Sequence, residues 1–298
     1  MVCLAFLLFF SLTPISWHTI ADFNFHFEKA KGCDSEKCQT YFPLLHWIGG
    51  FFSFNKPIFL FYLNFLLLFA TPMALFFITR KWITVWLYFS TTQYVYLMNG
   101  GGAYPQVLSI VFWLGLFATK NNFIRLALFI LGVIAHSQGL ILLGLTWLLL
   151  SAKEGWGKSF FPVCSSIFGR QEVLSQKVSQ ELITRNGFSL IEIPLKDFLN
   201  FFVRGFPLPF FLVALWQSIF KEKDWIPIIL SAFFFYSAVI SSPSISAGRI
   251  LVLIGLAFLP ALTRFYEGFT HKKWFVALTI ISFLVNFVTW ISYKLTCL

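Results

Sequence analysis

The stretch PIFLFYLNFLLLFATPMALFFITRK, residues 57–81, decides the fold class of this chain. Its apolar part, Pro57–Thr79, carries no charge and is long enough to cross a bilayer as one helix, which takes about 20 residues. Arg80 and Lys81 follow directly, and basic residues at the end of an apolar run mark the cytoplasmic side of a membrane. The stretch therefore predicts a transmembrane helix that ends in the cytoplasm.

The composition extends this prediction to the whole chain. Of its 298 residues, 58% are hydrophobic and 11% are charged, whereas soluble domains are about 25% charged. A mean hydropathy of +0.78 and repeated apolar runs predict an all-α polytopic transmembrane helix bundle of about nine spans, one integral membrane domain over residues 1–298 in the cell membrane. The net charge of +10 does not indicate a nucleic acid partner, because the basic residues lie at the ends of apolar runs.

The other expected spans come from runs of the same kind. Val2–Ile20 lacks a basic n-region and a small-residue cleavage site, so we expect a retained first span rather than a signal peptide. The later spans are expected at Trp82–Met98, Gln106–Thr119, Phe123–Leu150, Phe198–Phe220, Trp225–Ile240, Ala247–Leu262 and Trp274–Tyr293. One topology then places these basic groups in the cytoplasm: Arg80/Lys81, Lys120/Arg125, Lys221/Lys223 and Arg264/Lys272/Lys273.

In this topology the opposite, external side receives residues 21–56, the glycine loop 99–105, the longest extramembrane segment 153–197 and the serine-rich turn 241–246. Within the segment 153–197, Gln171–Thr184 has the apolar spacing of an amphipathic helix. The run Phe123–Leu150 leaves two interpretations open, because its centre, His136–Gly139, is polar and ends in glycine. It crosses the membrane once with a break, or it is re-entrant and inverts the topology of everything that follows.

The first external loop, residues 21–56, holds the densest group of reactive side chains. Asp22 and His26 are four residues apart, so on a helix their side chains share one face. The Asp22 carboxylate would then act as a general base or as a cation ligand, or both residues would simply be hydrated side chains at the start of the loop. Cys33 and Cys38 are close enough in sequence to form a disulfide in an oxidising compartment. Tyr41–Trp47 is typical of an interfacial helix, with His46 as a residue of its aromatic belt.

Three more residues are candidates for substrate binding. Tyr104 follows three glycines, which form a tight turn or a substrate-lining loop and lack the spacing of a nucleotide-binding loop. His136 within an apolar run should face the bundle or a wet cavity, with Gln138 as a partner that could reach it. Arg249, one turn into an expected span, would bind a phosphate or carboxylate, or else extend to the membrane surface.

Four short motifs contain these candidate residues: D-x-x-x-H-x-x-x-A (Asp22, His26, Ala30), Y-x-P-L-x-H-W (Tyr41, Pro43, Leu44, His46, Trp47), G-G-x-Y-P-Q (Gly101, Gly102, Tyr104, Pro105, Gln106) and A-H-S-Q-G around His136. Together these motifs resemble the GT-C superfamily of membrane glycosyltransferases over roughly residues 1–150 and, more loosely, around Arg249. Many members carry a second acidic motif in the next external loop. Here residues 99–104 contain no acid, so the sequence lacks the second motif that a metal-dependent mechanism with two carboxylates would use.

The resemblance implies an inverting transfer of a sugar from a polyprenyl-phosphate donor to an extracytoplasmic acceptor. Asp22 would be the catalytic base, or the ligand of a divalent cation (Mg or Mn) if one is needed, and Arg249 would bind the lipid phosphate. His26, Tyr104 and His136 would line the site. Two other hypotheses remain open: a transporter or lipid flippase in which His136 and Arg249 form the substrate path, and a non-catalytic subunit of a membrane complex.

Overall fold

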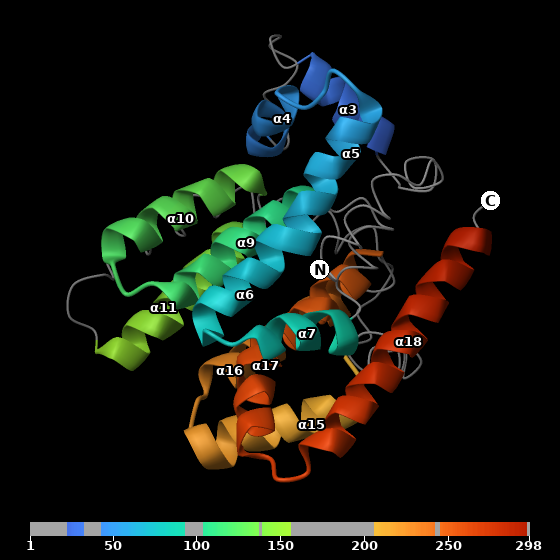
Figure 1. Ribbon diagram of the computed structural model, residues 1–298. Helices are drawn as coiled ribbons and strands as arrows, with labels where there is room; N and C mark the ends of the chain where they lie inside the picture. Colours follow the sequence, from blue (N-terminus) through green and yellow to red (C-terminus); the bar gives the residue numbers. More distant parts are fainter. Residues whose placement is uncertain are drawn as a thin grey trace.

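The computed structural model describes residues 23–32, 43–92, 104–136, 139–155, 206–241 and 245–296, and over these ranges every regular element is a helix (Figure 1). The all-helical class expected from the apolar runs is confirmed for them. The elements are α3 (Phe23–Lys31), α4 (Pro43–Gly50), α5 (Lys56–Phe65), η2 (Leu66–Ala70), α6 (Thr71–Thr79), α7 (Trp82–Thr91), α9 (Tyr104–Ala118), α10 (Asn122–Ala135), α11 (Gly139–Glu154), α15 (Leu208–Trp216), η4 (Gln217–Glu222), α16 (Ile226–Ser241), α17 (Ile245–Gly268) and α18 (Lys272–Thr296).

Two helices of the described part of the chain are long and apolar enough to cross a membrane. The first is Lys56–Thr79, where α5, the π-helical turn η2 and α6 form one helix of about 36 Å that coincides with the expected span Pro57–Thr79. The second is Ile250–Gly268 within α17. Shorter apolar helices include α9 and α10, with 15 and 14 residues. The two long helices indicate membrane association, and nine crossings are not confirmed.

The π turn in the first long helix has a visible cause in Pro72, which has no N–H to donate. In a π-helix, residue 72 would donate its N–H to the carbonyl of Leu67, five residues earlier. Because Pro72 has no N–H, the Tyr88 hydroxyl donates to that oxygen instead, at 2.7 Å. The Thr71 hydroxyl donates to the Leu66 carbonyl at 2.9 Å. Side chains thus supply the hydrogen bonds that the helix loses in its apolar surroundings.

Hydroxyl groups also join helices within the apolar interior. The Thr84 hydroxyl lies 2.7 Å from that of Thr79 and 2.8 Å from that of Thr263, which links α6, α7 and α17. The indole of Trp113 on α9 donates to the Thr146 hydroxyl on α11 at 2.7 Å. Bonds of this kind hold helices together where both the interior and the surrounding lipid are apolar.

Four ion pairs join the ends of helices along one face of the molecule. They are Lys81–Glu267 at 2.6 Å, Arg125–Glu154 at 2.7 Å, Lys153–Asp224 at 3.1 Å, and Arg264–Glu222. These pairs connect the helix ends within 80–82, 119–125, 153–155, 221–226 and 264–274, and we call this surface the ion-pair face. All the basic groups that the sequence assigns to the cytoplasmic side lie in these segments.

The pair of Arg125 and Glu154 corrects the expectation of a single crossing over Phe123–Leu150. Arg125 lies at the start of α10 and Glu154 at the end of α11, so the two helices run in opposite directions as a hairpin. Each is about 21 to 24 Å long, less than the roughly 30 Å of a bilayer core. Lys153 and Glu154 therefore lie on the ion-pair face and not on the external side, so the hairpin is re-entrant. The inversion expected to follow from a re-entrant hairpin does not occur, because Asp224 and Glu222 lie on the same face in their pairs with Lys153 and Arg264.

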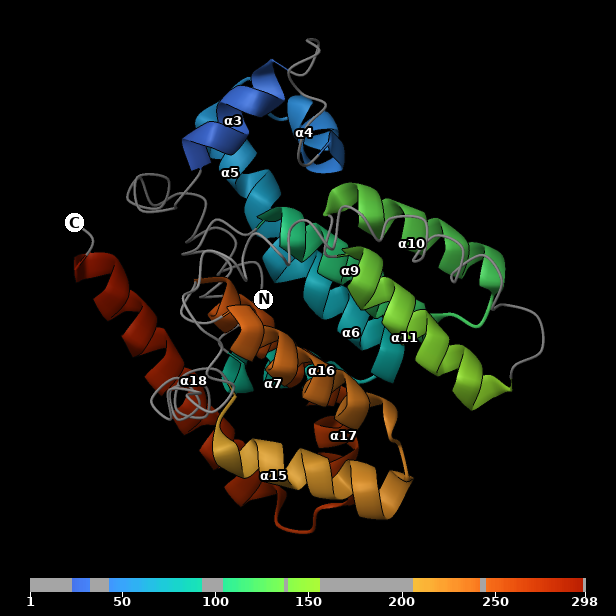
Figure 2. The same cartoon turned by 180° about the vertical axis from the view of Figure 1, so that it is seen from behind.

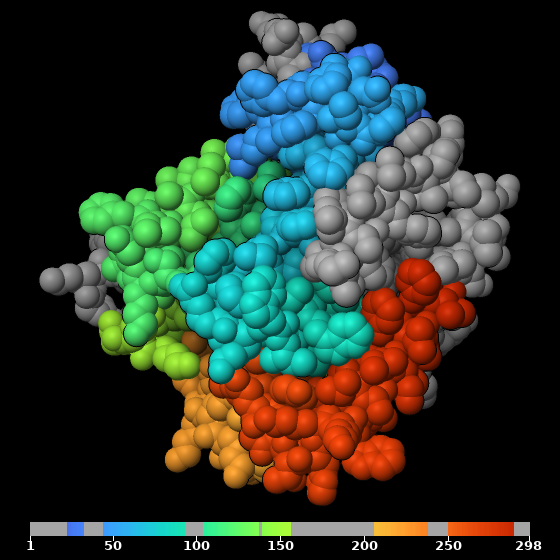
Figure 3. All heavy atoms as spheres, in the orientation of Figure 1, coloured from blue at the N-terminus to red at the C-terminus, as the bar shows by residue number. Residues whose placement is uncertain are grey.

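The remaining elements lie around this frame. α9, α10 and α11 pack together on one side of the Lys56–Thr79 helix, while α15–α18 and α7 lie on the other side (Figures 1 and 2). α3 and α4 form a layer at the far end, visible as the uppermost blue part of Figure 3. The expected amphipathic helix Gln171–Thr184, the first span Val2–Ile20 and most of 153–197 lie outside the described residues.

Candidate functional site

The candidate site lies at the end of the molecule opposite to the ion-pair face. Tyr104 begins α9, whose other end reaches Thr119, about 22 Å away at the helical rise of about 1.5 Å per residue. His136 follows α10, about 16 Å from Arg125. The backbone of Arg249 lies near the start of α17, about 22 Å from Arg264. The described parts of the predicted site thus share one end.

α3 is fixed at this end by an aromatic contact with α5. Phe23 and Phe27 stack with ring centroids 6.1 Å apart, and both meet the edge of Phe59, at 5.8 and 5.5 Å. Phe23, Phe27 and Ala30 are buried at helical spacing, whereas Glu28 on the same helix is exposed. The position directly before α3, where Asp22 stands, is therefore attached to a well-packed helix.

α4 packs against both α3 and α5. The Tyr62 hydroxyl donates to the Leu45 carbonyl at 3.1 Å. A Cβ at Gly49 would come within 2.8 Å of the Phe59 ring, so this approach requires glycine. α4 also contacts α9 and α10, and so it covers the end of the three-helix group that carries Tyr104.

A buried pair of histidines connects α3 to α4. Nδ1 of His26 lies 3.1 Å from Nε2 of His46, both residues are 3% exposed, and the ring edge of Phe25 faces both imidazoles. The ring centroids are 5.4 Å apart, so the two nitrogens face each other along the line between the rings, as in a hydrogen bond. His46 was expected in an exposed aromatic belt and is instead buried against His26.

His46 is neutral at physiological pH. Burial, together with the nearby charges of His26 and Lys29, lowers the pKa of His46 from 6.5 to about 4. One ring therefore donates its N–H and the other accepts through its lone pair. This contact gives His26 a role in holding α3 against α4, because Nδ1 of its ring faces His46.

Tyr104 and Ser109 bring polar groups into the interior at the start of α9. The Tyr104 side chain is fully buried, and neither its hydroxyl nor that of Ser109 has a hydrogen-bond partner among the described residues. The first residue of α11 lies against Ser109, because a Cβ at Gly139 would come within 2.6 Å of the Ser109 hydroxyl and 2.3 Å of the Gly132 carbonyl. Sequence patterns pointed to Tyr104 but gave no signal for Ser109.

His136 forms the tip of the α10–α11 hairpin. Its backbone is extended and its N–H donates to the Gly132 carbonyl at 3.1 Å, while its own carbonyl accepts from Gly139 N–H at 2.8 Å. The side chain is half-buried. Gln138, the partner expected from sequence, lies outside the described residues. The glycine at 139 lets the hairpin tip approach α9, so the His136 turn and Tyr104 lie within the same region.

Several predicted residues lie outside the described part of the chain. They are Asp22, Cys33 and Cys38, and the side chain of Arg249. Within the described residues no group of three or more histidine, cysteine, aspartate or glutamate side chains could hold a metal ion. Asp22, the expected ligand of a divalent cation, lies outside these ranges.

Comparison with protein-family models, with curated proteins and with solved structures finds no match for this chain. Functional assignment therefore depends on the residues themselves.

Proposed function

We propose that the chain is a multi-pass membrane glycosyltransferase that transfers a sugar from a polyprenyl-phosphate donor to an extracytoplasmic acceptor. The observation that supports the proposal is the common placement of the candidate residues. Tyr104, His136, the backbone of Arg249 and the helix that follows Asp22 all lie at the end opposite to the ion-pair face. A base and a phosphate-binding arginine can cooperate only if they reach the same side of the membrane.

In the proposed reaction Asp22 takes the proton of the acceptor hydroxyl, whose oxygen attacks the anomeric carbon of the sugar. The bond between that carbon and the lipid phosphate breaks, and Arg249 stabilises the negative charge that develops on the departing phosphate. The attack and the departure occur on opposite faces of the sugar, so the configuration inverts. Tyr104 and His136 line the acceptor side, and His26 holds α3 through His46.

The test is a transfer assay with the purified full-length chain, a set of polyprenyl-phosphate sugars and detergent-solubilised acceptor glycans. Asp22→Asn should abolish transfer while donor binding is retained, because the amide cannot accept the proton. Glu28→Gln is the matched control, since Glu28 is the exposed carboxylate of the neighbouring helix. Full transfer by Asp22→Asn would remove the catalytic assignment, and loss in Glu28→Gln alone would move the base to Glu28.

The α10–α11 hairpin gives separate support to a second function, a transporter or lipid flippase. Short paired helices with a polar, glycine-containing break are typical of substrate sites in transporters. In that case no bond is broken, and His136→Ala and Arg249→Gln would stop substrate movement into proteoliposomes while Asp22→Asn would not. Transport together with no transfer by the wild-type chain would favour this function.

A further inference from the structure

We propose that the ion-pair face binds the headgroups of anionic phospholipids through the six cations of this face that take part in none of the four ion pairs. The proposal depends on the membrane association of the chain and not on its catalytic activity. The described residues of this face contain four carboxylates, and each is taken up by one of the four ion pairs. The cations that remain are Arg80, Lys120, Lys221, Lys223, Lys272 and Lys273, and all six are exposed.

The arrangement of the pairs explains why these cations are available. Each ion pair bridges two helix ends, and so its position is set by the helix packing. The other cations lie in the same segments, and none of them forms an ion pair with a described acid. With ten cations against four carboxylates, the described part of the face carries a net charge of +6, and the six remaining cations lie in the segments 80–82, 119–125, 221–226 and 264–274.

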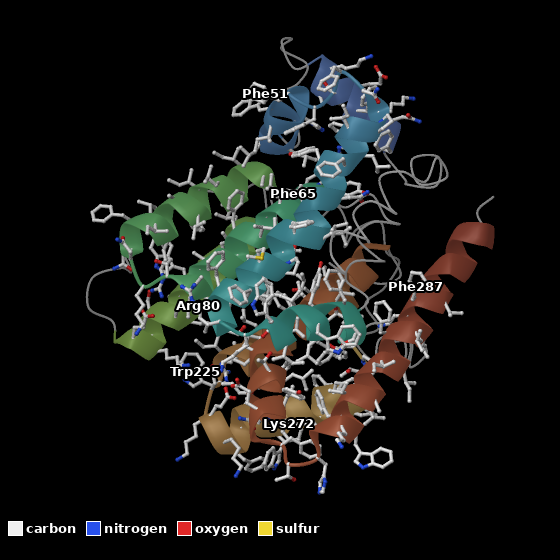
Figure 4. All side chains as sticks on the ribbon, in the orientation of Figure 1. Phe51, Phe65, Arg80, Trp225, Lys272 and Phe287 are labelled. Carbon is white, nitrogen blue, oxygen red and sulfur yellow. The ribbon has the colours of Figure 1, made fainter. Side chains whose placement is uncertain are left out.

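Aromatic side chains indicate a lipid surface rather than a soluble polyanion. Three of the six cations lie over aromatic rings: Arg80 over Phe77 at 5.1 Å, Lys221 over Trp216 at 5.4 Å, and Lys272 over Tyr266 at 5.5 Å. Exposed rings stand at the same helix ends, at Trp82, Phe123, Phe220, Trp225 and Trp274. In Figure 4, Arg80, Trp225 and Lys272 all lie on the side of Phe65 away from Phe51, with Lys272 farthest from it. Tryptophan mixed with lysine and arginine is typical of the headgroup level of a membrane.

The position of Lys272 and Lys273 gives independent support. They occupy the first turn of α18, which contains no acidic residue, and the helix dipole disfavours positive charge at that end. Dipole compensation accounts for Arg80 and Lys223 at the ends of α6 and η4, but it cannot account for these two lysines. A phosphate bound beside the start of α18 would be favoured by the dipole and by both side chains.

Phosphatidylglycerol is the probe for this face. The purified full-length chain in a zwitterionic detergent is titrated with dihexanoyl phosphatidylglycerol, and the rise in its unfolding temperature gives an apparent Kd. Dihexanoyl phosphatidylcholine and inorganic phosphate are titrated in parallel. We expect phosphatidylglycerol to bind at least about tenfold more tightly than either, because each cation near an anionic surface contributes roughly a fivefold gain. Added salt should weaken its binding by screening.

The variant K223Q/K272Q/K273Q removes three of the six cations, and K29Q/K31Q/K56Q is the matched control at the opposite end. We expect the first to lose at least about tenfold in apparent affinity for phosphatidylglycerol and the second to keep the wild-type value. Equal affinities for both lipids, equal stabilisation by inorganic phosphate, or wild-type affinity in the first variant would each overturn the proposal. If the triple variant fails to fold, K272Q/K273Q decides, since removing cations from a helix start does not weaken the helix.

Discussion

The bidentate pair of Arg125 and Glu154 makes a prediction with an unusual direction. The Arg125 side chain is 2% exposed, and its two terminal nitrogens donate to the two Glu154 oxygens at 2.7 and 2.8 Å. Its Nε donates to the Thr119 carbonyl at 2.9 Å. The Glu154 side chain is 37% exposed, so water reaches one partner of the pair and not the other. The loss of stability should therefore differ between a variant that removes Arg125 and one that removes Glu154.

Glu154→Ala leaves a buried guanidinium whose charge has no partner. Breaking a buried ion pair in this way costs about 3–5 kcal/mol, and the remaining bond to Thr119 places the expected loss near about 3 kcal/mol. Arg125→Met keeps most of the apolar stem and leaves a carboxylate that water can hydrate. Its expected cost is about 1–2 kcal/mol, the loss of the hydrogen bonds alone.

The assay is equilibrium unfolding of the purified chain in mixed micelles, followed by far-ultraviolet circular dichroism. The double variant should lose less than the sum of the two single variants, because neither charge is then left without the other. If Arg125→Met costs as much as Glu154→Ala, the argument from the unequal exposure of the two partners is wrong. If both variants unfold like the wild type, the bond does not hold the hairpin and the correction to the topology loses its support.

The same pair predicts a pH dependence. The hydrogen bonds from Arg125 hold the pKa of Glu154 below its ordinary value of 4.5. A carboxylate with a lowered pKa in the folded state contributes stability above its unfolded value, and the contribution is lost as the pH falls through the folded value. Stability should therefore fall on acidification below about pH 4.5, and Glu154→Gln should remove that part of the decrease.

Two further predictions concern the candidate site. Gly139→Ala should unfold or loosen the hairpin, because its Cβ would lie 2.3 Å from the Gly132 carbonyl, whereas Gly268→Ala, with nothing within 4 Å, should keep the wild-type unfolding temperature. Because the pKa of His46 is lowered from 6.5 to about 4, its contribution to stability is complete above about pH 6.5 and should fall by about 3 kcal/mol between pH 6.5 and 4. His46→Phe should flatten this slope in denaturant titrations.

The sequence predicted the helical class and the clustering of basic helix ends because both depend on local patterns. The expected span Pro57–Thr79 and the helix Lys56–Thr79 coincide within one residue at the start. Such a run is decided by its own apolar length and by the basic residues that end it. No contact between distant residues is needed to recognise it.

The hairpin was not predictable in the same way. The polar break at His136–Gly139 is compatible with a bent crossing and with a turn, and the local pattern cannot separate them. What separates them is a bond between residues 29 positions apart, Arg125 and Glu154. Arg125 resembled an ordinary cytoplasmic cation, since a sequence does not show which cations are buried.

The burial of His26 could have been predicted from the sequence. It was paired with Asp22 because residues four apart share a helix face. Phe23, Phe27 and Ala30 mark the buried face of the same helix at spacings of three and four, and His26 lies within that stripe. A histidine on an apolar stripe should be expected to face the interior and to need a partner there, which is His46.

The distribution of acids limits where a catalytic base can lie. The described residues contain five carboxylates, four of them in ion pairs on the face opposite to the candidate site. The fifth, Glu28, is exposed on α3 at the same end as Tyr104 and His136. A transferase with its site at that end must therefore use Glu28 or an acid outside the described residues, such as Asp22. The comparison of Asp22→Asn with Glu28→Gln consequently tests both the activity and the location of its base.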